Sequence, residues 1–382
     1  MRVFLLVFFL LYGGLHYYLF VKANAALALG TLSSLFLILV MLSMVFAPLL
    51  VHVSERHGFF SVARLFSFVG YSWMGFVFLC FWCFFLIDLY RLLIFAGGLI
   101  SPGFFAHLHP SPKYGFFLPL LLSLSIALYG YYEAGHIRTE RIVLKTPKLP
   151  KEAGTLKITQ ISDVHLGMIV RDERLTRILK EVKKSNPDIF ISTGDLVDAQ
   201  INRLEGLAEM LREINPRYGK LAVTGNHEFF AGLPQALEFT RKAGFKVLRG
   251  EGLTVAGLIN FVGVDDPAGG GRSLSKDVTE KDLLSGLPQD KFTVLLKHRP
   301  ELDKDALGLF DLQISGHTHQ GQIFPFRLIT RLFFPYDGGS FRLPNHSLLH
   351  VSRGTGTWGP PIRFLAPPEV TVYELMGEAK PE

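Results

Sequence analysis

The sequence predicts a chain of two joined parts, an all-α membrane region of four helices followed by an α/β domain. Residues 1–135 contain only nine Lys, Arg, Asp or Glu, although the 382-residue chain contains 39 Lys or Arg and 33 Asp or Glu. From about residue 150 onward, short apolar runs typical of strands alternate with segments of helical periodicity. Polar motifs directly follow several of those runs. We therefore expect a transmembrane region at 1–135, a basic linker at 136–153, the α/β domain at 154–376 and a tail at 377–382.

Four segments of the first part lack Lys, Arg, Asp and Glu and are long enough to cross about 30 Å of hydrocarbon as helices. They are residues 3–21, 27–51, 65–87 and 114–132. A cleaved signal peptide is the alternative for the first segment, because Ala23-Asn24-Ala25 has the form of a cleavage site. The apolar run is longer than a usual signal core and three more spans follow, so we favour four uncleaved spans. Residues 92–105 contain Gly97-Gly98 and Pro102-Gly103, which predict an interfacial or re-entrant piece.

Positive charges near the span ends predict a multi-pass protein of the cell membrane with its α/β domain in the cytoplasm. If the N-terminus lies inside, the inner segments hold Arg2, Arg56, Arg64, Arg138, Arg141, Lys145, Lys148 and Lys151. The outer segments hold only Lys22, Arg91 and Lys113. The net charge of +6 includes no dense basic cluster with interleaved aromatic residues, so we expect no nucleic-acid-binding patch. Oligomeric state is not indicated by the sequence.

Two cysteines, Cys80 and Cys83, lie in the third predicted span. Their spacing is found in redox and metal sites, but the pair stands alone in an apolar helix. We interpret them as buried, inert thiols.

The α/β domain is predicted from apolar runs that match strands and two segments that match helices. The predicted strands are 156–161, 189–192, 221–224, 260–264, 292–296, 312–315, 348–351 and 370–373. The predicted helices are 173–184 and 204–214.

Five polar motifs lie at the carboxyl ends of predicted strands. They are Asp163-Val-His165, Gly194-Asp195, Gly225-Asn226-His227-Glu228, His298 and Gly316-His317-Thr-His319. Carboxyl ends of strands in an α/β sandwich converge on one rim, where active sites usually lie. If the backbone stays extended, alternate residues such as Asp163 and His165 project together. Two Asp, one Asn and four His of this set could bind metal, and they are the mixed oxygen and nitrogen ligands that borderline divalent ions prefer.

This ordered set of motifs resembles that of the calcineurin-like metallophosphoesterase family over about residues 155–375. With the four spans in front of it, the chain also resembles transmembrane proteins with a C-terminal metallophosphoesterase domain. The resemblance implies a metallophosphoesterase-type β-sandwich flanked by helices, with a binuclear metal centre. It further implies that Asp163, His165 and His319 hold one ion, that Asn226, His298 and His317 hold the other, and that Asp195 bridges them. The chain departs from the pattern at Gln320, where relatives often have glycine, and this places a larger side chain beside the ligands.

A binuclear centre of this kind predicts hydrolysis of a phosphodiester or pyrophosphate by a hydroxide held between the two ions. Ligands without sulfur suit Mn, Fe or Zn, and Mn is our first choice. His227 is the candidate for protonating the leaving oxygen, and Glu228 either orients it or caps a strand or helix end. Arg353 either contacts the substrate phosphate or forms a structural salt bridge.

The membrane region bears on the substrate. A catalytic domain tethered to a lipid bilayer by a basic segment meets lipid-linked phosphoesters at high local concentration. Similar enzymes cleave the pyrophosphate of UDP-diacylglucosamine, but these residues do not favour that substrate over a cyclic nucleotide or a phosphoprotein. The alternative is a membrane sensor or regulatory module whose phosphoesterase-like domain binds nucleotide or a partner with little turnover. Metal-dependent hydrolysis separates the two.

Overall fold

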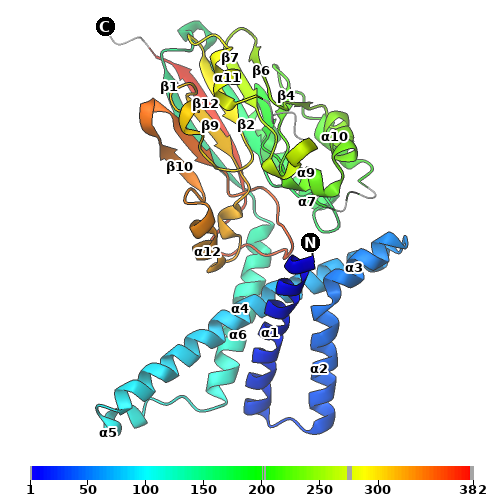
Figure 1. Ribbon diagram of the computed structural model, residues 1–382, viewed down its shortest axis with the longest axis vertical. Helices are drawn as coiled ribbons and strands as arrows, with labels where there is room; N and C mark the ends of the chain where they lie inside the picture. The colour runs from blue at the N-terminus through cyan, green and yellow to red at the C-terminus, as the bar shows by residue number, and fades with distance from the viewer. Residues whose placement is uncertain (1, 200, 202–203, 273–277, 379–382) are drawn as a thin grey trace. The chain divides into compact units, whose positions relative to one another are not determined.

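The computed structural model describes residues 2–199, 201, 204–272 and 278–378 (Figure 1). The chain divides into a helical unit, Met1–Tyr132 with Gly359–Ile362, and an α/β unit, Glu133–Trp358 with Arg363–Glu382.

The helical unit is built from apolar helices. They are α1 (Arg2–Leu27), α2 (Thr31–Val45), α3 (Ala47–Arg56), α4 (Phe60–Gly98), α5 (Pro102–Ala106) and α6 (Tyr114–Ala134). Among the described residues, three of them are long and apolar enough to cross a membrane, or up to four spans if the bent pair α2 and α3 is one span. Cys80 and Cys83 are buried free thiols, as expected.

Two details of the predicted spans are corrected. The predicted span 27–51 is bent by 53° between α2 and α3, next to Pro48 in the first turn of α3. Proline removes a backbone donor and disfavours a helical conformation in the preceding residue, which accounts for the break. The predicted interfacial or re-entrant piece 92–105 does not begin as a separate segment, because α4 continues without interruption to Gly98.

The α/β unit contains two six-stranded sheets among its described residues. The first has the order β1 (Arg138–Thr146), β12 (Glu369–Gly377), β2 (Thr155–Ile161), β3 (Ile189–Ser192), β4 (Lys220–Ala222) and β5 (Lys246–Val247). The second has the order β10 (Gly339–Arg342), β11 (Leu348–Val351), β9 (Leu312–Ser315), β8 (Phe292–Leu296), β7 (Ile259–Gly263) and β6 (Glu251–Val255). Strands β2 to β5 run parallel to one another, as do β7, β8, β9 and β11.

Alternating side chains of the strands build two cores. In β3, Ile189 and Ile191 belong to the core that also includes Phe261 and Ile314 of the second sheet, whereas Phe190 belongs to the core beneath the helices. The helices that contribute to this second core are α7 (Asp172–Ser185), α8 (Leu207–Arg212) and α10 (Leu233–Lys242). The remaining helices are α9 (Asn226–Ala231), α11 (Glu280–Ser285) and α12 (Phe326–Phe333). The predicted sandwich flanked by helices is confirmed.

The segment predicted as a basic linker at 136–153 is largely a strand. Strand β1 pairs in parallel with β12 from Arg138↔Glu369 to Thr146↔Gly377, and it forms one edge of the first sheet. An edge strand carries polar and charged side chains, which is why its sequence resembles a linker. Helix α8 is also shorter than the predicted 204–214.

Candidate metal centre

All seven predicted ligands come together at the carboxyl ends of parallel strands. Asp163 and His165 follow β2, Asp195 follows β3, Asn226 follows β4, His298 follows β8, and His317 and His319 follow β9. Because β2, β3 and β4 belong to one sheet and β8 and β9 to the other, the ligands lie where the carboxyl edges of both sheets meet. Six of the seven side chains are buried, and His317 is partly buried.

The first set of ligands consists of Asp163, His165 and His319, whose candidate atoms all lie within 4.8 Å of one another. The Nε2 atoms of His165 and His319 are 3.1 Å apart. His319 Nε2 lies 3.6 Å from Asp163 Oδ1. These nitrogen and oxygen atoms are close enough to hold one ion.

The second set surrounds His298. Its Nε2 lies 3.3 Å from Asp195 Oδ2, 3.1 Å from His317 Nδ1 and 3.2 Å from Asn226 Oδ1. Asp195 Oδ2 also lies 3.8 Å from His165 Nε2 of the first set. Asp195 therefore lies between the two sets.

The hydrogen bonding of His298 shows that its surroundings suit a cation. His298 Nδ1 lies 2.8 Å from the carbonyl oxygen of Thr193, to which it can only donate. In the neutral imidazole, Nε2 then carries a lone pair. That lone pair faces the oxygens of Asp195 and Asn226, an arrangement that is repulsive unless a positive charge lies among them. The donor chemistry therefore fits a divalent ion.

The pKa values of the ligand side chains also indicate that negative charge and lone pairs gather at this site. Burial lowers the pKa of His298, but the nearby Asp195 and Asp163 carboxylates raise it to about 10. Burial raises the pKa of Asp195, but His298 and His227 hold it well below its usual range. Burial, together with neighbouring imidazolium charge, lowers the pKa values of His165 and His317 to about 3. Neutral imidazoles of this kind are ready to bind metal.

The backbone at the ligands is left-handed rather than extended. The φ angles are 52° at Asp163, 54° at His165, 74° at His317 and 48° at His319. The expectation that extended alternation aligns these pairs is therefore wrong, and tight turns aim the side chains instead. Such non-glycine conformations each cost about 1–3 kcal/mol and persist where the surrounding fold imposes them.

Two motif glycines are required by close approach. A Cβ at Gly225 would lie 2.2 Å from Asp195 Oδ1, and one at Gly316 would lie 2.3 Å from Asp163 Oδ2. Because glycine has no side chain, the loops that contain Gly225 and Gly316 can approach the carboxylates of Asp195 and Asp163 closely.

Glu228 supports the loops and does not orient His227. Its carboxylate accepts backbone N–H groups of Gly225 at 2.7 Å, Asp195 at 3.0 Å and Leu196 at 2.9 Å. The capping alternative for Glu228 is therefore confirmed.

The partner of His227 is Asp198, which the sequence reasoning missed. Asp198 Oδ1 lies 2.9 Å from His227 Nδ1. The backbone N–H of His227 donates to Asp195 Oδ1 at 2.8 Å, which fixes His227 beside the carboxylate proposed to bridge the ions. The only sequence signal was a second aspartate three residues after Asp195 in the same loop.

Arg363 was also missed. Its fully buried guanidinium lies 3.0 Å from His319 Nδ1 and donates to the carbonyl oxygens of His319 and Gly356. Arg363 thereby fixes the plane of the His319 ring. Its sequence context, after Pro360-Pro361, gives no indication of this contact.

The guanidinium of Arg353 forms ion pairs with Glu369 and, at 3.2 Å, with Glu140. This is the structural alternative considered for it, and a direct phosphate contact stays a prediction.

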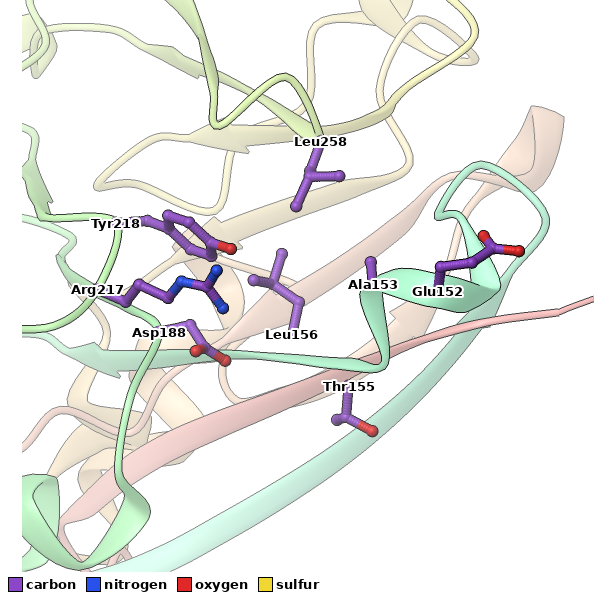
Figure 2. A pocket seen from close by; sticks show the side chains of 8 residues that line it. All are labelled: Glu152, Ala153, Thr155, Leu156, Asp188, Arg217, Tyr218 and Leu258. Atoms are coloured by element: carbon purple, nitrogen blue, oxygen red, sulfur yellow. The ribbon is translucent and has the colours of Figure 1, made fainter.

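A separate pocket lies at the amino ends of β2 and β3 and is lined by Glu152, Ala153, Thr155, Leu156, Asp188, Arg217, Tyr218 and Leu258 (Figure 2). Its Asp188 carboxylate accepts the Lys157 N–H at 2.8 Å. The pocket lies at the edge of the sheet opposite to the ligands and has no histidine in its lining, so it is not the candidate site.

Comparison with known proteins agrees with this geometry. A model of the calcineurin-like phosphoesterase family matches residues 156–321. An uncharacterized metallophosphoesterase of Aquifex aeolicus is 40% identical over 261 residues, which cover 68% of this chain and 99% of the relative. A transmembrane protein with metallophosphoesterase domain of Danio rerio is 32% identical over 266 residues, which cover 66% of this chain and 61% of the relative. Among solved structures, the Pseudomonas putida nuclease MPE is 16% identical with a TM-score of 0.28, over 53% of this chain and 77% of that one.

The fold and the ligand cluster define the protein as a metal-dependent phosphoesterase. The chain belongs to the calcineurin-like metallophosphoesterase family, as its motifs predicted. It joins that domain to N-terminal apolar helices and resembles the transmembrane members of the family.

Proposed function

We propose that this protein is a membrane-anchored binuclear phosphoesterase that hydrolyses a phosphodiester or pyrophosphate. The observation that carries the proposal is the pair of adjacent ligand sets, one of Asp163, His165 and His319 and the other of Asp195, His298 and His317. Asp195 of the second set lies 3.8 Å from His165 of the first. Asp163, His165 and His319 would hold one ion, Asn226, His298 and His317 would hold the other, and Asp195 would be shared between them. Mn is the first candidate, and Fe or Zn also suits these ligands.

When bound, the two ions supply an activated water and neutralise charge on the phosphoryl group. His227 donates a proton to the leaving oxygen as its bond to phosphorus breaks and the bond from water to phosphorus forms. His227 Nδ1 faces Asp198, so Nε2 is the nitrogen available for this transfer. Asp195 holds the His227 backbone and so fixes the donor relative to the ions.

Membrane attachment supports the proposal that the substrate is linked to a lipid. The apolar helices form a multi-pass anchor, and the excess of basic residues on one side of the spans favours a cytoplasmic catalytic domain. A tethered domain encounters lipid-linked phosphoesters at high local concentration, which favours a substrate in the bilayer.

The test is metal-dependent hydrolysis by the purified full chain. The protein is stripped by chelation, reloaded with Mn²⁺, Fe²⁺ or Zn²⁺, and assayed with bis(p-nitrophenyl) phosphate and with p-nitrophenyl phosphate. We expect diester turnover with metal, loss of turnover in Asp195→Asn, and wild-type turnover in Asp290→Asn, a matched change at an exposed position.

The regulatory alternative makes the opposite prediction. If two ions bind per chain and neither these esters nor a pyrophosphate or lipid-linked ester turns over, the domain is a binding module and the enzymatic proposal is wrong.

A further inference from the structure

Helix α12 presents an apolar face to solvent. Leu328 and Leu332 are 57% and 80% exposed, and Ile329 and Phe333 are 39% and 73% exposed. Each pair is four residues apart, so the four side chains form one continuous strip, which we call the α12 face. Thr330 is the one buried residue described in this helix.

Helix α12 turns its charged side chains toward the α/β unit and its apolar side chains toward solvent, the reverse of an ordinary surface helix. Arg327 and Arg331 both pair with Asp337, at 2.6 Å and 3.2 Å, and the Asp337 side chain is only 1% exposed. The arginines thus attach the helix to the α/β unit, and the leucines point away from it. A surface helix normally buries its apolar strip against the core. The α12 face is therefore left available for a contact outside the α/β unit.

Both ends of helix α12 lie next to the loop that carries the ligands His317 and His319. A Cβ at Gly321, two residues after His319, would lie 2.4 Å from the backbone of Arg327, so the start of α12 is pressed against the ligand loop. Phe334 follows the helix, and its ring centroid is 4.9 Å from that of His317. A contact at the α12 face is therefore made beside the ligands.

Exposed aromatic rings also lie beside His227. Phe230 and Trp358 are 61% and 55% exposed, and their ring centroids lie 5.5 Å and 5.8 Å from that of His227. Tryptophan in particular is enriched at the interface between a membrane and water.

We propose that the α12 face, with Trp358 and Phe230, docks on the lipid bilayer and admits the phosphoester headgroup of a membrane lipid to the metal centre. The proposal rests on the proposed hydrolytic function and names its substrate class. The chain's own apolar helices hold this unit at a bilayer. Helix α12 has two arginines and no acidic residue, and Asp337 balances only one of these charges, so the surface attracts anionic headgroups.

Insertion of the α12 face is measured on the full chain in nanodiscs. Leu332→Cys, in a background in which Cys80 and Cys83 are replaced by serine, carries an environment-sensitive fluorophore, and the lipids carry a spin-label quencher. Val143→Cys is the matched control, because Val143 is an exposed apolar residue on the edge strand β1. We expect quenching at position 332 and none at 143.

Turnover gives the second readout. The substrates are phosphatidyl-p-nitrophenol in the nanodisc and bis(p-nitrophenyl) phosphate in solution, which share a leaving group. In L328E/L332E we expect the ratio of lipid to soluble turnover to fall by about tenfold, because two exposed apolar side chains that would insert into the bilayer are replaced by charges at an anionic surface. V143E should keep the wild-type ratio.

The outcomes separate the two proposals. No metal-dependent turnover of either ester means that the hydrolytic function is wrong, whatever the quenching shows. Soluble turnover without quenching at position 332, or with an unchanged ratio in L328E/L332E, overturns the docking proposal alone. Self-quenching that occurs only with two labelled copies per nanodisc, in the absence of lipid quenching, assigns the α12 face to a second copy and also overturns it.

Discussion

Replacing Asp198 with asparagine tests the role assigned to His227. Asp198 Oδ1 lies 2.9 Å from His227 Nδ1, and both side chains are largely removed from solvent. Burial lowers the pKa of His227, but Asp195 and Asp198 raise it, to about 9 in the metal-free protein. An opposite charge at this distance shifts a pKa by about 1–3 units. We therefore expect Asp198→Asn to lower the pKa of His227 by about one unit or more.

The sign of the effect on turnover follows from the role of a general acid. His227 must be protonated to act, so kcat falls as the pH rises through its pKa. The alkaline limb of the kcat profile should therefore move to lower pH in Asp198→Asn. The assay follows kcat against pH for a diester with an alkyl leaving group and for a p-nitrophenyl diester. The loss should be larger for the alkyl ester, whose more basic leaving oxygen depends more on a proton donor.

Two controls isolate this effect. Bound cations lower the pKa of His227, so wild type and variant are compared at equal metal content. Metal content has to be checked because Asp198 also lies 4.0 Å from Nδ1 of the predicted ligand His165, and its replacement can change metal binding. Asp198→Glu keeps the charge and should keep the limb close to its wild-type position. An alkaline limb that does not move in Asp198→Asn at full metal loading would refute the assignment of His227 as the proton donor.

Three other predictions follow from the geometry. In Gly225→Ala the new Cβ would lie 2.2 Å from Asp195 Oδ1, so we expect the variant to bind less metal, as measured by elemental analysis. Gly103→Ala is the control, because its new Cβ would meet nothing within 4 Å. Equal metal contents in the two variants would contradict this prediction. Glu228→Ala leaves three buried backbone N–H groups without their acceptor, at about 1–3 kcal/mol each, so the Tm should fall clearly, and an unchanged Tm would show that these bonds are not needed. In metal-free protein the pKa of His298 is raised to about 10 from its usual value of 6.5, so its stabilising contribution is present below about pH 6.5 and is lost as the pH rises toward 10. The Tm difference between metal-loaded and metal-free protein should widen over that range, and a constant difference would contradict the charge balance described for the site.

The sequence was sufficient for the ligands but not for the residues that support them. Asp163, Asp195 and His298 could be found because each follows an apolar run, and parallel strands bring their carboxyl ends together. Arg363 could not be found, because its contact with His319 joins residues 44 positions apart through a loop of no regular pattern. Asp198 was overlooked because an aspartate in a loop is more often a turn residue than a histidine partner.

The strand β1 and the backbone of the ligand loops were missed for different reasons. Strand β1 lies at a sheet edge, where its side chains are mostly exposed, and it therefore lacks the apolar run that revealed the other strands. The left-handed φ angles at Asp163 and His317 are disfavoured by local propensity, so no local pattern can predict them. They are set by long-range packing, which the sequence expresses only through the complete fold.

Strain and charge repulsion at the ligands have the same structural origin. The turns at Asp163 and His317 are held because the strands before them are anchored in a core that is almost entirely buried, with Ile161 and Ile314 at 0% exposure. The same anchoring keeps His298 Nε2 within 3.3 Å of Asp195 Oδ2. A core that fixes lone pairs toward one another lowers the reorganisation needed when a cation binds, because the ligands cannot relax away from the position that it occupies. The hydrophobic sandwich is therefore the part of the molecule that preorganises the metal centre, and substitutions in its core, such as Ile314→Ala, act on metal affinity as well as on stability.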